Sequence, residues 1–117
     1  MTSANQSMKF SLDEVLQGML ASVEQDTFTD DTTRLASMFE GLATTAPLFA
    51  PMAAGVDPQA VASALKKLED KAILKHTDGT YMLTDSGRAH CVSGKRTLFN
   101  KGDQEQLEAA AKVFATI

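Results

Sequence analysis

The sequence contains no tryptophan, one tyrosine and a single cysteine among its 117 residues. With Cys91 alone an internal disulfide is impossible, which fits a reducing compartment. A structural zinc site uses about four ligands, and only His76 and His90 could join Cys91 as non-carboxylate ligands. A nucleophile or half of a metal site at His90–Cys91 is one interpretation. We expect instead that Cys91 is a small buried hydrophobic residue.

Long apolar runs are also missing, and none approaches the roughly 18 to 20 residues that span a bilayer. The opening residues, MTSANQSMKF, lack the positive and apolar segments of a signal peptide. We expect residues 1–10 to be a disordered lead-in and the protein to be cytoplasmic. Neither a phosphate-binding glycine loop nor a G-x-S-x-G motif is present. We therefore expect no enzyme activity, no cofactor and no metal.

Basic residues are scarce in the first half of the chain. Residues 1–55 hold two bases and seven acids, a net charge of −5. Residues 56–117 hold nine bases and eight acids, a net charge of +1. A dedicated DNA-binding domain is usually clearly basic on at least one face. This balance argues against tight, nonspecific binding to phosphates.

Two helices are predicted in the acidic half. The first runs from 11 to about 25, with Ser11 and Glu14 as a capping box. Its apolar positions recur at helical spacing: Leu12, Val15, Leu16, Met19, Leu20 and Val23. After a break at 26–31, Thr29 or Asp30 is expected to cap a second helix over 31–44. Its core stripe is Leu35, Met38, Phe39 and Leu42.

The second half predicts a helix followed by a hairpin. Residues 48–54 form a short apolar helix or turn, and Asp57 and Pro58 then start a helix over 57–71. Strands at 73–76 and 81–84 flank TDGT, a strong hairpin signal. The remaining elements are expected to be a helical turn over 84–92, a loop over 93–101, and a helix over 103–117 that Asp103 caps.

This order resembles a winged helix-turn-helix of the MarR and PadR kind, in a mainly helical α+β fold with a small β-hairpin. PLFAPMAAGVDPQAVASALKKLEDKAILKH is similar to the family's short helix, glycine turn, recognition helix and first wing strand. YMLTDSGRAH is similar to the segment that follows the wing. The resemblance covers 31–92, within one domain of residues 11–117. Ala72 stands where the family commonly has glycine, a change that costs little unless the backbone there is left-handed.

The resemblance implies a set of DNA contacts. The helix over 57–71 would read bases in the major groove, with Gln59, Ala62, Ser63, Lys66 and Lys67. The wing and the basic stretch RAHCVSGKRTLFNK would contact the DNA backbone, with Lys75, Arg88, Lys95 and Arg96. The alternative is a solvated surface of ordinary lysine content, because acids are interspersed among the lysines over 66–75.

Two functions follow from the sequence. The first is a transcriptional regulator that binds double-stranded DNA as a homodimer, with helices 11–25 and 103–117 supplying the two-fold interface. The second is a protein–protein interaction module on the same scaffold, with little or no DNA binding. The small residues Ala62 and Ser63 and the acidic hairpin tip at Asp78 favour the second.

Overall fold

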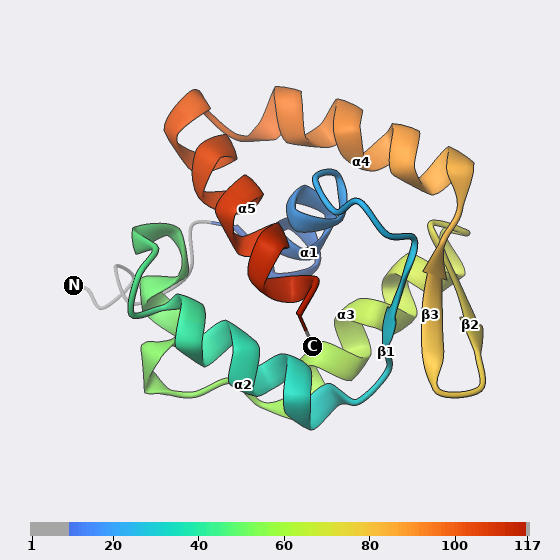
Figure 1. Cartoon of the computed structure of the whole chain (residues 1–117), viewed down its shortest axis with the longest axis horizontal. Coiled ribbons are helices and arrows are strands. Elements are labelled where there is room, and N and C mark those ends of the chain that lie inside the picture. Colours follow the sequence, from blue (N-terminus) through green and yellow to red (C-terminus); the bar gives the residue numbers. More distant parts are fainter. Residues whose placement is uncertain (1–9, 117) are drawn as a thin grey trace.

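In the computed structural model, which describes residues 10–116, six helices pack together with a small three-stranded antiparallel sheet that lies at one side of the molecule (Figure 1). The elements are α1 (Leu12–Leu20), β1 (Thr27–Thr29), α2 (Thr32–Leu42), the 3-10 helix η2 (Pro47–Ala54), α3 (Pro58–Asp70), β2 (Leu74–Thr77), β3 (Thr80–Leu83), α4 (Asp85–Leu98) and α5 (Lys101–Phe114). The predicted mainly helical α+β composition is confirmed.

Helix α1 lies in the middle of the molecule, in contact with α3, α4 and α5 (Figure 1). The predicted capping box is present: the Ser11 hydroxyl accepts from the Glu14 amide, and the Glu14 carboxylate accepts from the Ser11 amide. The helix ends at Leu20, and the predicted continuation to residue 25 is wrong. Four side chains of its stripe have no exposed surface: Val15, Leu16, Met19 and Leu20. This stripe is therefore buried against other parts of the same chain.

The sheet has the order β1-β3-β2, so β3 is its central strand. The predicted hairpin is confirmed, with Asp78 and Gly79 at its turn and Gly79 at φ +80°. The sequence did not predict β1, which lies in the expected break at 26–31. Phe28 of β1 pairs with Tyr81 of β3, which pairs in turn with His76 of β2. The hairpin is thus joined to the body of the protein along a third strand.

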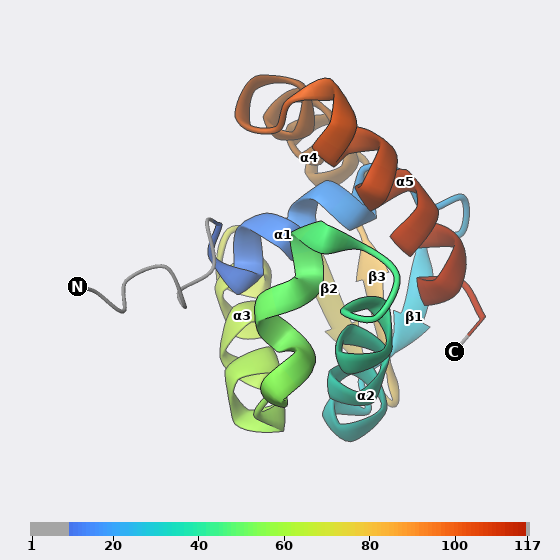
Figure 2. The ribbon, with the colours of Figure 1, turned by 90° about the vertical axis from the view of Figure 1, so that its left-hand side faces the viewer.

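Helices α2 and α3 pack against each other, with η2 between them in the sequence (Figure 2). Asp31 caps α2, and not Thr29 or Asp30 as expected. Asp57 caps α3 and Pro58 is its first residue, as predicted. The chain leaves α3 through Ala72 at φ +61°, in the left-handed region. An alanine side chain is strained in that region, and glycine is not.

Helix α4 is longer than the sequence indicated, and α5 begins and ends earlier than predicted. Helix α4 continues into the expected loop at 93–101 as far as Leu98, and Asn100, not Asp103, caps α5. Cys91 on α4 is fully buried, as predicted. Three side chains of α5 fill the core from this side: Leu107, Ala110 and Phe114. The apolar stripe of α5, like that of α1, is therefore covered by the chain itself.

The expected lead-in of residues 1–10 lies outside the described residues, except for Phe10. The Phe10 ring is buried and lies 4.3 Å from the Phe99 ring, centroid to centroid. Within residues 10–116, no helix combines the length and apolar character that crossing a bilayer requires.

Candidate nucleic-acid interface

The outward face of α3 carries the residues predicted to read bases. Val61, Leu65 and Leu68 are fully buried on the inward face, which turns the opposite face to solvent. The predicted residues follow helical spacing and so share one side of α3: Gln59, Ala62, Ser63, Lys66 and Lys67. All are exposed except Ala62, which is half-buried. The structure therefore brings this set together on one surface.

One of the two lysines on this face has an acidic partner. The ammonium group of Lys66 lies 3.4 Å from the carboxylate of Asp70, one helical turn further on. Both side chains are about two thirds exposed, so the pair is a weak surface contact that another anion can replace. Lys67 has no ion pair within the described residues. Lys67 is therefore the freest cation for a phosphate on this face.

The hairpin of β2 and β3 lies beside α3, which contacts β2. Lys75 of β2 is exposed and pairs in register with Met82 of β3, which is also exposed. At the tip, the Thr77 hydroxyl lies 2.9 Å from the Thr80 hydroxyl and closes the turn. Asp78 at this tip is exposed. The hairpin thus carries one exposed lysine, Lys75, on β2 and one exposed aspartate, Asp78, at its tip.

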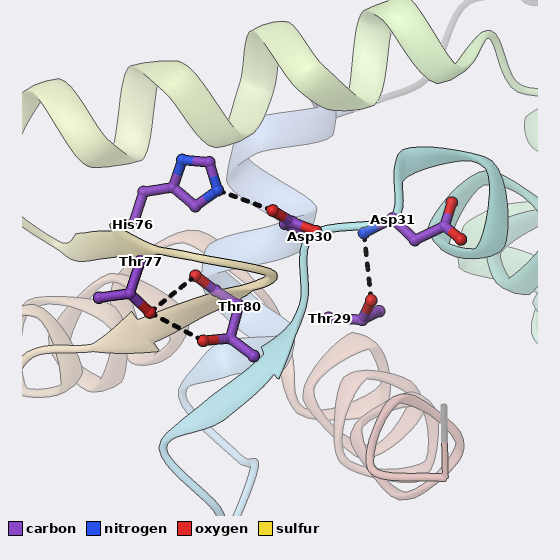
Figure 3. Close-up of polar contacts among 6 residues, drawn as sticks. All are labelled: Thr29, Asp30, Asp31, His76, Thr77 and Thr80. Carbon is purple, nitrogen blue, oxygen red and sulfur yellow. Dashed lines mark hydrogen bonds and ion pairs between the residues drawn. The ribbon is translucent and has the colours of Figure 1, made fainter.

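Two contacts tie the hairpin to the start of α2, and Figure 3 shows the first of them, between His76 and Asp30. The imidazole Nε2 of His76 lies 2.8 Å from the carboxylate of Asp30. The backbone amide of Asp30 also donates to the carbonyl of Gly79 in the turn, at 3.2 Å. The next residue, Asp31, caps α2 with its side chain. The position of the hairpin and the start of α2 are therefore set together.

His76 also lies flat against Tyr81. The two rings are 4.2 Å apart, centroid to centroid, with 12° between their planes. Burial raises the pKa of Tyr81, and the nearby carboxylates of Glu69 and Asp30 raise it further, while Lys66 acts in the opposite direction. The Tyr81 hydroxyl therefore keeps its proton at neutral pH and remains a hydrogen-bond donor. Local sequence patterns indicated no role for His76 beyond that of a potential metal ligand, because Asp30 is 46 residues away.

Two of the predicted backbone contacts are engaged within the protein. The guanidinium of Arg88 donates to the carbonyl of Val23 and to the carboxylate of Asp26, both at 2.7 Å. These bonds hold the connection between α1 and β1 against α4. Since both hydrogen bonds would have to be exchanged for contacts to DNA, Arg88 is a poor candidate for a phosphate ligand.

Lys95 makes a similar internal contact on α4. Its ammonium group donates to the Ser22 hydroxyl at 2.9 Å and to the Glu108 carboxylate at 3.1 Å. Only 13% of this side chain is exposed. Lys95 therefore joins α4 to α5 and to the end of α1, and it does not project into solvent.

Arg96 is exposed but distant from the hairpin. It lies on α4 eleven residues beyond Asp85, which follows β3 directly, so the helix carries it about 16 Å away. Helix α1 lies between α3 and α4 and contacts both (Figure 1). The predicted contacts thus separate into two surfaces: α3 with Lys75 on one side, and Arg96 on the other.

The described residues offer no group of three or more histidine, cysteine, aspartate or glutamate side chains that could hold a metal ion. Burial raises the pKa of Cys91 to about 11, with a smaller opposing effect from Arg88. The thiol is therefore neutral at physiological pH and unsuited to nucleophilic attack.

No family model matches the chain, and neither a curated protein nor a solved structure is significantly similar to it.

Proposed function

We propose that the chain is a winged-helix protein that binds double-stranded DNA through α3 and acts as a transcriptional regulator. The observation that carries this proposal is the outward face of α3, which lies beside the hairpin of β2 and β3. Strand β3 of this hairpin also pairs with β1. In a winged helix, the helix in the position of α3 enters the major groove. The order α1, β1, α2, α3, β2, β3 and the sheet order β1-β3-β2 support that arrangement.

The side chains on α3 suggest how the DNA would be read. Gln59 lies in the first turn, where recognition helices contact base edges, and its amide can pair with adenine. Ser63 is one turn further on and can bond to any base edge, while Ala62 can only touch a thymine methyl. Lys66 and Lys67 would meet phosphates or guanine. Few groups on this face discriminate between bases, so we expect low sequence selectivity per copy.

A salt-dependent titration tests this proposal. The protein is titrated against random-sequence duplex at about 50 mM and about 200 mM salt, where phosphate-driven binding weakens steeply. The variant is Lys67→Glu, and the matched control is Lys112→Glu, an equal charge change at an exposed position of α5. We expect Lys67→Glu to lower the affinity about tenfold and the salt slope by about 1, and Lys112→Glu to change neither much. Equal affinities for the two variants would contradict the proposal.

A protein–protein module is the second candidate, and the charge distribution favours it. Lys66 is paired with Asp70, Arg88 and Lys95 are engaged internally, and the chain carries a net charge of −4. Absence of DNA binding at either salt concentration would favour this candidate. A partner recovered at about 0.3 M salt, where phosphate-driven contacts are weak, should then be lost in Ser63→Arg and kept in Lys112→Glu.

A further inference from the structure

An apolar groove runs between α2 and α5, on a surface that neither the α3 face nor the hairpin includes. It consists of two adjoining hollows, of about 600 Å³ and about 490 Å³, that share Leu42, Thr45 and Val113. Met38 adds a further apolar side chain to the first hollow, and Ala109 adds one to the second. Val113, between them, is 42% exposed. We call this surface the α2–α5 groove.

The two ends of the α2–α5 groove carry opposite charges. Arg34 lines only the first hollow and Glu105 lines only the second, and no other charged residue lines either one. Helices α2 and α5 run in roughly opposite directions (Figure 1), and each charged residue lies near the start of its own helix. Among the described residues, neither side chain forms an ion pair. The groove is thus basic at one end, apolar in the middle and acidic at the other.

We propose that the α2–α5 groove binds a second copy of this chain across a two-fold axis that passes close to Val113. A two-fold interface brings the same patch from both copies together, so the patch must complement itself. Rotation about that axis places Arg34 of each copy against Glu105 of the other, and Val113 against its equivalent. This inference goes beyond the proposed function and does not depend on DNA binding. It replaces the buried stripes of α1 and α5 as the surface of self-association.

Charge reversal tests the pairing directly. Sedimentation equilibrium without DNA measures the dimer dissociation constant of the wild-type chain, Arg34→Glu, Glu105→Arg and the variant that carries both changes. Each single reversal places like charges together twice per dimer, so we expect the dissociation constant to rise about tenfold. The double variant restores opposite charges, and we expect its dissociation constant to return to within about threefold of wild type.

The apolar centre has its own matched pair of variants. Val113→Asp removes the exposed side chain in the middle of the groove, and Leu98→Asp makes the same change at a residue of α4 that is 43% exposed. We expect Val113→Asp to be a monomer and Leu98→Asp to dimerise like the wild type. Circular dichroism and thermal melting establish that each variant is folded, so that loss of the dimer is not loss of the fold.

Three results would overturn the inference. The first is a wild-type chain that stays monomeric up to about 1 mM, the concentration at which even weak specific association is populated. The other two are unchanged dimerisation in the single reversals and no recovery of dimerisation in the double variant. DNA titration of the same samples separates the two proposals. A monomer that binds DNA refutes only the interface, and a dimer that binds no DNA refutes only the proposed function.

Discussion

The imidazole of His76 and the carboxylate of Asp30 are joined by a 2.8 Å contact between β2 and the residue that precedes the cap of α2. Both side chains are about a third exposed, so we expect the contact to contribute about 0.5–1 kcal/mol to the free energy of unfolding. A double-mutant cycle of His76→Ala and Asp30→Ala, followed by urea unfolding, measures this coupling. His76→Ala should cost more than Asp30→Ala, because it also removes the stacking on Tyr81. A coupling near zero would mean that the side-chain contact adds nothing to the sheet pairing and to the bond from the Asp30 amide to the Gly79 carbonyl.

We expect the protein to be more stable with glycine than with alanine at position 72. The residue has φ +61° at the exit from α3, where an L side chain is strained. Since glycine adopts this geometry without strain but loses more entropy on folding, we expect Ala72→Gly to stabilise the protein by about 0.5–1 kcal/mol. The measurement is the midpoint of urea unfolding. Destabilisation would show that the backbone at this position is not left-handed in solution.

Gly87 and Gly94, both on α4, are predicted to respond to alanine in opposite ways. A Cβ at Gly87 would meet the backbone of Ile73, with its Cα at 2.7 Å and its carbonyl oxygen closer still. Because backbone cannot move aside cheaply, we expect Gly87→Ala to cost about 3 kcal/mol or more. A Cβ at Gly94 meets nothing within 4 Å, and Gly94→Ala should stabilise the helix by about 0.5–1 kcal/mol. Thermal unfolding of the two variants compares them, and similar effects would contradict the packing of α4 on Ile73.

Arg88 and Arg96 provide a test of which basic side chains stabilise the fold. Arg88→Met keeps the length of the apolar stem but removes the hydrogen bonds to Val23 and Asp26. We expect it to lower the free energy of unfolding by about 1–3 kcal/mol, because the Val23 carbonyl loses its charged donor. Arg96→Met, at an exposed position of the same helix, should change it by less than about 0.5 kcal/mol. Equal effects would refute the structural role of Arg88.

Cys91 gives a prediction for alkaline pH. The folded-state pKa is about 11, against an ordinary value of 9.0. Between these values the unfolded thiol loses its proton while the folded thiol keeps it, so stability falls as pH rises through that window; below pH 9 both states are protonated and the effect vanishes. Relative to Cys91→Ala, the wild type should lose about 1–2 kcal/mol between pH 8 and pH 10. A constant difference between the two proteins would refute the raised pKa.

Local sequence signals predicted most helices and the hairpin, because caps and apolar spacing act over a few residues. The capping box at Ser11, the Asp57–Pro58 start of α3 and the Asp78–Gly79 turn are of this kind. Strand β1 escaped prediction although Thr and Phe favour strands, because three residues are too few to show a pattern and the flanking aspartates are typical of a break. It forms by pairing with β3, more than fifty residues away.

The positions of the predicted DNA-contact residues were also foreseen only where local sequence signals decide the structure. The face of α3 followed from helical spacing, which is local. Arg88 and Lys95 looked available because their partners are remote in the sequence: Val23 and Asp26 for the first, and Ser22 for the second. The place of Lys95 in a helix was missed as well, since Ser93 and Gly94 are typical of a loop, yet α4 continues through them.

The central position of α1 has a consequence for how the chain can be made and trimmed. Its apolar side chains are synthesised first, yet α3, α4 and α5, which cover them, emerge later from the ribosome. Until α5 is complete, the nascent chain exposes a surface that other chains can bind. A fragment limited to residues 31–92, which retains α2, α3 and the hairpin, would leave that core without its centre. Among the described residues, the core therefore draws on every helix from α1 to α5.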